Sequence, residues 1–435
     1  MNYNQIIYQI YPFGFCGAPE TNDGVPAHRI LKVLDWIEHL RKLNVTAVLF
    51  NPVFESDAHG YDTRDFDRID TRLGTNEDFQ KVCTALQKEG IDVILDGVFN
   101  HVGRGCPMFQ DVIHNRDSSP YKDWFHVNFY DPNGPDGFWY EGWEGHNELV
   151  KLNLDNPSVR NYLIEKADSW IEKYHIAGLR LDVAYMLNRQ FLYELTSHIR
   201  STHPDFLFIG EMINGDYNVL LNDNLLNSVT NYECRKGIYS SFNSHNLCEI
   251  GYSLNRQFAD EQWTLYKGRH LLSFVDNHDV NRIASELSEK DMLPLVYSLL
   301  TAMPGMPCIY YGSEWGAEGK KENGSDRNLR PCFEKPVSNE LTAYIEKLNQ
   351  MRLEHPVFTD GNYRQLQSQN EYLVFERNTE SEKLIYALNL KKEPVTVWAD
   401  FGTGEMIDAM SGNTYSLNNG LTIPPETALF LIQNH

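Results

Sequence analysis

Four apolar runs that each end in a carboxylate constrain this chain more than any other feature. The first, GLRLDVAYM at residues 178–186, predicts a short buried strand in which Arg180 and Asp182 lie on one face, because strand side chains alternate. An arginine beside an aspartate in an apolar strand is costly unless the pair has a role. The other three runs are 93–101, 206–212 and 274–282. Together they indicate parallel strands that deliver acids to one rim of a barrel, as in a hydrolase that works with carboxylates.

Segments typical of strands and of helices alternate through most of the chain. The strand-like segments are 6–11, 45–50, 91–96, 178–182, 206–211, 228–233, 271–276 and 307–312. Apolar residues at helical spacing predict a helix over 27–43, and a capping box of Thr75 with Asp78 predicts one through Gln87. Eight such units fit a (β/α)8 TIM barrel. The alternative, a doubly wound open sheet, would be favoured by a G-x-G-x-x-G after the first strand, which the sequence lacks.

Two parts of the chain depart from this alternation. Residues 102–151 have no clear period and many Gly, Pro, Asp and aromatic residues, which predicts a loop-rich insertion after the third strand. Short alternating runs near the end predict antiparallel strands. We therefore expect a catalytic barrel over 1–101 and 152–357, an insertion over 102–151, and a C-terminal antiparallel β-sandwich domain over 358–435.

Composition narrows the class of partner and the compartment. A formal charge of −22 argues against nucleic acid or an anionic membrane as partner, but it does not hinder binding of a neutral sugar. The seven cysteines show no C-x-x-C spacing, so neither a disulfide framework nor a zinc site is expected. The N-terminal residues do not show the basic and apolar regions of a signal peptide, and no apolar stretch is long enough to span a membrane. The expected location is a reducing cytoplasm.

Carboxylates at strand ends suit cleavage of a glycosidic bond. That reaction needs one carboxylate at the anomeric carbon and one protonated acid for the leaving oxygen. Arg180 should keep Asp182 ionised, as a nucleophile requires, whereas the apolar residues before Glu211 should raise its pKa, as a general acid requires. Asp279 is flanked by His278, which could bind sugar hydroxyls while the acid opposes oxocarbenium charge.

The four stretches resemble the four signature regions of the α-amylase family of glycoside hydrolases, in the same order. The matching motifs are DGVFNH, GLRLDVA, GEM and FVDNHD. Further motifs extend the likeness over residues 5–335: YQIYPFGF, HGYDTRDF, LGTNEDF, LVKLNLDNP and PGMPCIYYGSEWG. LVKLN and RLDVA are most similar to the subgroup of neopullulanases, cyclomaltodextrinases and maltogenic amylases, although the N-terminal β-domain usual in that subgroup is lacking.

The resemblance implies a role for each matching residue. Asp182 would be the nucleophile that forms a covalent glycosyl-enzyme, Glu211 the acid/base and Asp279 the transition-state stabiliser. The implied substrate-binding residues are Arg180, which would hold Asp182; His101, His278 and Tyr61, which would contact the sugar; and Asp62 and Arg282, whose ion pair closes one end of the site in relatives. The expected activity is that of a retaining α-glucan hydrolase acting on α-1,4 bonds of malto-oligosaccharides, cyclodextrins or starch fragments, with α-1,6 cleavage left open.

Two alternatives stay open at this point. A glucanotransferase of the same family would use the same acids, with a second sugar in place of water. A non-catalytic, carbohydrate-binding or chaperone-like relative would have lost catalytic acids that this chain retains. The expected partner is an α-glucan oligosaccharide, and the choice between monomer and dimer is open.

No cofactor is expected for the chemistry. A structural calcium ion is left open, because Met186 replaces the histidine that helps to hold calcium beside Asn100 in relatives. In a second candidate loop near the N-terminus, Asn22 and Asp23 fit a metal loop, but Gly17 and Pro19 stand where ligands are expected.

Overall fold

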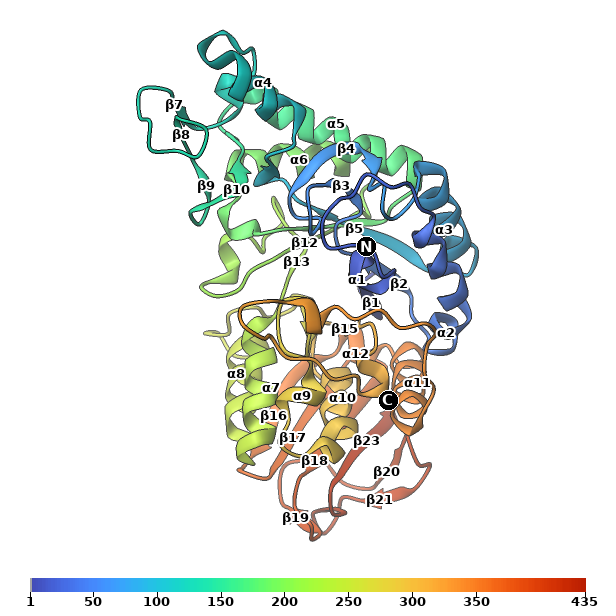
Figure 1. Ribbon diagram of the computed structural model, residues 1–435. Coiled ribbons are helices and arrows are strands. Elements are labelled where there is room, and N and C mark those ends of the chain that lie inside the picture. Colours follow the sequence, from blue (N-terminus) through green and yellow to red (C-terminus); the bar gives the residue numbers. More distant parts are fainter. Residues whose placement is uncertain (1) are drawn as a thin grey trace.

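The computed structural model describes residues 2–435, and its centre is a closed barrel of parallel strands (Figure 1). In sheet order the strands are β13 (Ser228–Val229), β12 (Leu207–Gly210), β11 (Gly178–Leu181), β5 (Asp92–Gly97), β2 (Ala47–Phe50), β1 (Ile7–Ile10), β15 (Met306–Tyr310) and β14 (Leu272–Phe274). A parallel bridge between Thr230 and Leu272 joins the two ends of this order. The predicted TIM barrel is confirmed.

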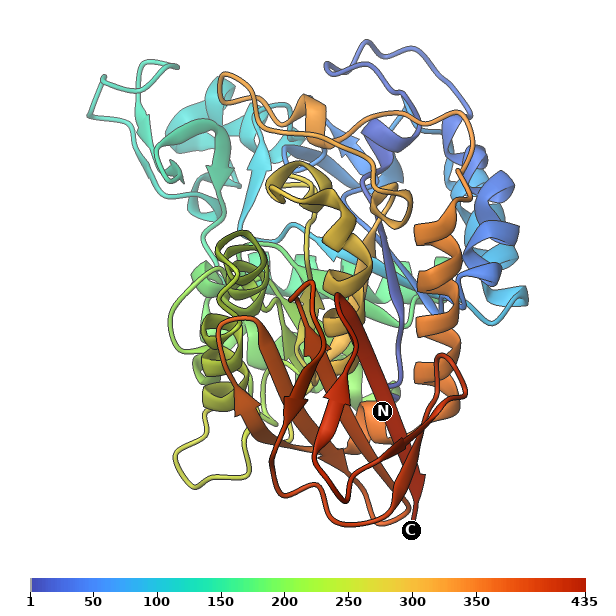
Figure 2. The same cartoon turned by 90° about the horizontal axis from the view of Figure 1, so that it is seen from below.

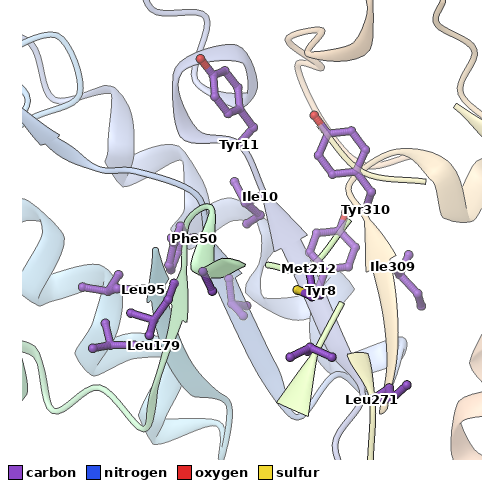
Figure 3. Packing of buried hydrophobic residues seen from close by; sticks show 14 of the residues in the cluster. Tyr8, Ile10, Tyr11, Phe50, Leu95, Leu179, Met212, Leu271, Ile309 and Tyr310 are labelled. Atoms are coloured by element: carbon purple, nitrogen blue, oxygen red, sulfur yellow. The ribbon is translucent and has the colours of Figure 1, made fainter. Parts of the chain in front are cut away.

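Side chains along these strands alternate between the barrel interior and the surrounding helices. The interior cluster consists of Ile7, Ala47, Leu49, Ile94, Leu207, Ile209, Leu272, Phe274, Met306 and Cys308. Their neighbours in sequence belong to the larger core shared with the helices, and Figure 3 shows Tyr8, Ile10, Phe50, Leu95 and Leu179 in it. Along each strand, the side chains that point into the barrel become polar at the C-terminal end. These buried polar residues are Gln9, Asn51, Asp96, Arg180 and Glu211. The apolar interior therefore ends where the polar site begins.

Helices cover the outside of the barrel. They are α2 (Ile37–Lys42), α3 (Asn76–Lys88), α5 (Pro157–Tyr174), α6 (Arg189–Thr202), α7 (Tyr232–Ser244), α8 (Cys248–Phe258), α10 (Leu293–Ala302) and α11 (Glu340–Glu354). The predicted capping box starts α3, because the Thr75 side chain accepts a hydrogen bond from the Asp78 N–H and the Asp78 carboxylate accepts one from the Thr75 N–H, both at 3.2 Å. Each bond satisfies a backbone donor that the helix leaves free.

The helix expected over 27–43 is in part a different kind of helix. Residues Arg29–Trp36 form a 3-10 helix, η1, and only α2 is α-helical. The buried residues of η1 are Ile30, Val33 and Trp36. Their spacing of three matches the three residues per turn of a 3-10 helix, so the core selects that geometry.

The sixth strand is shorter than the segment 228–233. β13 ends at Val229, and Asn231 begins α7, since its side chain accepts a hydrogen bond from the Cys234 N–H at 3.1 Å. An asparagine cap therefore ends the extended segment earlier than the residue pattern indicates.

The C-terminal part is a two-layer antiparallel structure, as predicted. One sheet has the order β16 (Asn362–Ser368), β17 (Tyr372–Asn378), β18 (Glu382–Asn389), β23 (Thr427–Asn434), β20 (Glu405–Asp408) and β21 (Thr414–Ser416), and β19 (Val395–Val397) pairs with β22 (Leu421–Ile423). The layers share their own apolar core. This part lies beside the barrel helices (Figure 2), where the Tyr386 and Ser298 hydroxyls are 2.8 Å apart.

The segment between β5 and α5 lies to one side of the barrel (Figure 1). It contains β6 (His101–Gly103), α4 (Pro107–Asn115), β7 (Val127–Asn128), β8 (Trp139–Tyr140), β9 (Gly142–Trp143) and β10 (His146–Lys151). The three-stranded sheet β6-β10-β9 gives it more regular structure than the expected loops. It starts at the C-terminal end of β5, so it leaves the barrel at the end where polar side chains are buried.

Thr75→Ala is expected to lower the free energy of unfolding by about 1 kcal/mol, because it removes the cap of α3. Urea denaturation measures this. Thr414→Ala is the control, since Thr414 is exposed and outside any helix cap, and it should change stability by less than about 0.5 kcal/mol. Equal losses in the two variants would show that the capping box contributes nothing.

Candidate active site

The inward polar side chains meet around the guanidinium of Arg180. Its Nη1 donates to both oxygens of Asp96 at 2.9 and 3.0 Å and to Asp182 Oδ1 at 2.8 Å. Its Nη2 lies 2.8 Å from Glu211 Oε1. The strand register explains this, because Arg180 lies opposite Asp96 on β5 and opposite Ile209 on β12, two residues before Glu211. One buried cation therefore serves three buried carboxyl groups.

Burial dominates the pKa of the two acids expected to react. It raises the pKa of Asp182 well above its usual value, while Arg180 acts in the opposite direction. It also raises the pKa of Glu211, the predicted direction. The expectation that Arg180 keeps Asp182 ionised is therefore incomplete, because Arg180 is shared with Asp96 and Glu211. Asp182 and Glu211 titrate as a pair that retains a proton.

The backbone after Asp182 is strained in a way that serves Glu211. Val183 has φ 39° and ψ 46°, a left-handed conformation that is unusual for a β-branched residue. Its N–H donates to Glu211 Oε2 at 2.9 Å. Glu211 is thus held from two sides, by a side chain of β11 and by the amide that follows this strand.

Asp279 has a different environment, in the loop after β14. His278 Nε2 lies 2.9 Å from its Oδ2, and Arg330 Nη2 donates to its Oδ1 at 3.0 Å. Burial would raise the pKa of Asp279, but His278 and Arg330 outweigh it and hold this pKa well below its usual value. Asp279 is therefore ionised when the pair of Asp182 and Glu211 holds a proton.

Two further expected sugar contacts lie at the same rim. Tyr61 donates from its hydroxyl to Asp96 Oδ2 at 3.1 Å, and its ring stacks on that of His278 with centroids 5.5 Å apart. His101 Nδ1 lies 3.2 Å from the Asn100 amide nitrogen, a donor, so the imidazole hydrogen is on Nε2. This buried Nε2 has no partner within residues 2–435, and burial lowers the pKa of His101 to about 3. A neutral His101 thus presents an N–H near the Tyr61 backbone.

The expected ion pair of Asp62 with Arg282 is wrong for this chain. Arg282 is fully buried, and it donates to the Tyr311 and Leu329 carbonyl oxygens at 2.9 and 3.1 Å. Its guanidinium also lies over the Tyr310 ring, 4.5 Å from the centroid. These partners hold the end of the Arg282 side chain inside the core, although its Nε has no hydrogen-bond partner among residues 2–435. Asp62 instead accepts a hydrogen bond from the Gly60 N–H at 3.1 Å.

Three contributors to the site were not identified from the sequence. Gln9 and Asn51 lie in the inward rows of β1 and just beyond β2, and the two-residue period could have indicated both. Arg330 comes from a long segment without periodicity, so no local pattern placed it beside Asp279.

A guanidinium occupies the candidate metal loop near the N-terminus. Arg72 Nη1 donates to the carbonyl oxygens of Pro19, Glu20 and Ala58 at 2.9, 3.2 and 2.7 Å. A cation already bound to these oxygens leaves them unavailable to calcium, so this loop does not fit the ion. Across residues 2–435, no three His, Cys, Asp or Glu side chains are grouped so that they could hold a metal.

The second candidate calcium position, beside Asn100, has lost one of the ligands that relatives supply. The Asn100 amide nitrogen faces His101 at 3.2 Å, and the thioether of Met186 is a poor ligand for a hard cation.

None of the helices within residues 2–435 has both the length and the apolarity needed to cross a membrane.

Comparisons with known proteins agree with this geometry. The family described as "Alpha amylase, catalytic domain" matches residues 9–352. A maltogenic alpha-amylase of Bacillus acidopullulyticus is 29% identical over 96% of this chain and 75% of the relative, and neopullulanase 2 of Thermoactinomyces vulgaris is 28% identical over 94% and 74%. A solved cyclomaltodextrinase has a TM-score of 0.87 and 26% identity over 99% of this chain and 78% of its own. A cyclic alpha-maltosyl-(1→6)-maltose hydrolase from Arthrobacter globiformis has a TM-score of 0.83 and 25% identity over 99% of each chain. Because the matched residues span most of the chain and include the whole cluster around Arg180, the chain belongs to the alpha-amylase family of glycoside hydrolases.

Proposed function

We propose that this chain hydrolyses α-1,4 glucosidic bonds of malto-oligosaccharides, cyclodextrins or starch fragments with retention of configuration. One observation carries the proposal: Asp182 and Glu211 bind the same guanidinium, while Asp279 is held separately, by His278 and Arg330. Glycosidic cleavage requires acids with different protonation states, and these three acids lie in two different electrostatic environments. Activity on α-1,6 bonds is a second part of the proposal, supported by the similarity to the Arthrobacter hydrolase.

In the first half of the reaction, Asp182 attacks the anomeric carbon while Glu211 donates a proton to the leaving oxygen. Arg180 donates to Oδ1 of Asp182 at 2.8 Å, so Oδ2 is the oxygen that this guanidinium leaves available. That oxygen is therefore the one that forms the glycosyl bond as the glycosidic bond breaks. The proton shared by the pair goes to the leaving sugar from Glu211.

In the second half, Glu211 takes a proton from water, and the water oxygen displaces Asp182 from the anomeric carbon. Both displacements invert the centre, so the net result is retention. The ionised Asp279 opposes the positive charge that develops on the sugar in each step. His101 and Tyr61 bind the sugar whose bond is cleaved, the former through its Nε2–H.

Product analysis tests the proposal. The purified protein is incubated with maltotriose, β-cyclodextrin, pullulan, isomaltose and starch, and products are followed by chromatography and by proton NMR of the first anomer released. Release of the α-anomer is expected. Failure to cleave any of these sugars, or first release of the β-anomer, would contradict the proposal. Products longer than maltotriose at high maltotriose concentration would identify the glucanotransferase instead.

The pH dependence of kcat/KM should be bell-shaped. Activity rises with pH as the pair of Asp182 and Glu211 loses its first proton, and it falls as the second proton, needed on Glu211, is lost. Because burial raises the pKa of both groups, both limbs should lie above the usual range for carboxyl groups. Glu211→Gln should abolish the alkaline limb along with most of the activity on natural sugars. An alkaline limb that persists in the residual activity would assign it to another group.

We also infer that the protein works in the cytoplasm. All seven of its cysteines are free, and an intracellular maltogenic amylase of Bacillus subtilis is 28% identical over 82% of the chain. Cell fractionation of the source organism tests this, and recovery only outside the cytoplasm would exclude it.

A further inference from the structure

A row of hydrogen bonds crosses the barrel beneath the proposed sugar site, from Asp96 through two amides to His278. Asn51 donates from Nδ2 to Asp96 Oδ2 at 3.1 Å, and Gln9 donates from Nε2 to Asn51 Oδ1 at 2.9 Å. Gln9 Nε2 also lies 3.0 Å from His278 Nδ1. We call Gln9 and Asn51 the amide relay. All four residues are buried, and Gln9, the most exposed of them, is only 5% exposed. Their polar atoms are shielded from water, so they need hydrogen-bond partners within the protein.

The orientation of the row is fixed from the Asp96 end. Both oxygens of Asp96 accept from Arg180, so Asn51 must turn its NH2 group toward Asp96 and its oxygen toward Gln9. Gln9 must then present its own NH2 group to Asn51. Reversing either amide would set two acceptor oxygens against each other in a buried place, which costs more than losing one hydrogen bond.

The second N–H of Gln9 determines the tautomer of His278. A donor at Nδ1 means that Nδ1 accepts, so the imidazole hydrogen is on Nε2. The opposite side of the ring agrees with this. The Tyr61 hydroxyl gives its only hydrogen to Asp96, so it can only accept from His278 Nε2, with which it is also in contact. The same Nε2–H is shared with Asp279 Oδ2, 2.9 Å away.

We propose that Gln9 and Asn51 are positioning residues that hold His278 as the Nε2–H tautomer, so that its N–H faces Asp279 and the sugar. The catalytic meaning of this proposal rests on the proposed function. With the other tautomer, the Nε2 lone pair would face the ionised Asp279, and the site would lose a donor where positive charge must be opposed. Tyr11 stacks on His278 with centroids 6.0 Å apart and an interplanar angle of 9°, and this fixes the plane of the ring.

Gln9→Leu tests the relay, because it removes the donor at nearly constant volume. Histidine labelled with 15N in the full-length protein reports the tautomer through two-bond proton–nitrogen correlations, and His278→Asn identifies the signals. The wild type should show the hydrogen on Nε2, and Gln9→Leu should populate Nδ1–H. Gln9→Glu places an acceptor at Nδ1, so His278 should become doubly protonated.

Kinetics on maltotriose give the second measurement. Gln9→Leu should lower kcat/KM by about 10- to 100-fold, the usual cost of losing a group that orients a reactive residue, and mostly through kcat. Gln5→Leu is the matched control. Gln5 is buried in the same inward row as Gln9 but at the opposite end, where it accepts from the Thr46 hydroxyl. It should leave both the tautomer and kcat within about twofold.

The outcomes separate the relay from a structural role. A hydrogen on Nδ1 in the wild type, or an unchanged tautomer in Gln9→Leu, would refute the proposal. A loss of activity in Gln9→Leu no larger than in Gln5→Leu would reduce Gln9 to a packing residue. If the wild type cleaves none of the sugars tested, the proposed function fails, and the NMR measurement still decides the tautomer.

Discussion

Asp182→Asn is expected to lower kcat on maltotriose by about 10^4-fold or more, because the amide cannot form the glycosyl intermediate and nearly isosteric replacement leaves the rest of the site in place. Single-turnover kinetics with the purified variant measure the loss. Asp92→Asn is the matched control. Asp92 is the first residue of β5, so it lies at the end of the barrel opposite the site, and it is exposed. It should retain wild-type kcat within about twofold.

The same variant should be at least as stable as the wild type. Asp96, Asp182 and Glu211 share one guanidinium, so removing one buried acid relieves the pair that must hold a proton. Urea denaturation checks this, and it also separates lost chemistry from lost folding. A clear fall in stability together with the fall in kcat would mean that Asp182 is mainly a structural partner of Arg180.

Direct trapping completes the test of Asp182. A fluorinated glucoside slows hydrolysis of the covalent intermediate, so the wild type should accumulate an adduct on the peptide that contains residues 178–186. Mass spectrometry locates it. An adduct on Glu211 or Asp279 would reverse the assignment of roles.

The two-residue period of strands accounts for most of what the sequence could predict about the site. Arg180 and Asp182 share a face, and the same alternation applied to β5 and β12 brings Asp96 and Glu211 to that face. Parallel strands in one barrel then carry these residues to a common rim. The acids were therefore predictable from apolar runs that end in a carboxylate, without knowledge of any contact.

What the period cannot supply is the direction of long side chains and the course of loops. Arg282 follows the FVDNHD motif as in relatives, yet its guanidinium turns into the core and binds carbonyls instead of Asp62. Arg330 reaches Asp279 from a loop 51 residues further along the chain. Both depend on contacts between distant segments, and these have no local pattern. The left-handed Val183 is likewise invisible in sequence, because its residue type disfavours that conformation.

Arg72→Met is expected to lower the free energy of unfolding by about 3–5 kcal/mol, because it leaves Asp70 as a buried charge without its partner. Arg72 and Asp70 are both fully buried, with Nη2 of the arginine 2.8 Å from Oδ2 of the aspartate. The same guanidinium binds the carbonyls of Pro19, Glu20 and Ala58, so the N-terminal loop loses its link to the barrel as well.

Three comparisons make this prediction specific. Arg68→Met is the control, because Arg68 is 60% exposed and 3.6 Å from Glu55, and it should cost less than about 1 kcal/mol. Arg72→Met combined with Asp70→Asn should recover part of the loss, since the unpaired charge is gone. If Arg72 fills the place of a cation, thermal unfolding of the wild type should be the same in EDTA and in calcium. A rise in Tm with calcium in the wild type would show that the loop binds the ion despite the guanidinium. If Arg72→Met lowers the free energy of unfolding no more than Arg68→Met does, Arg72 does not hold the loop.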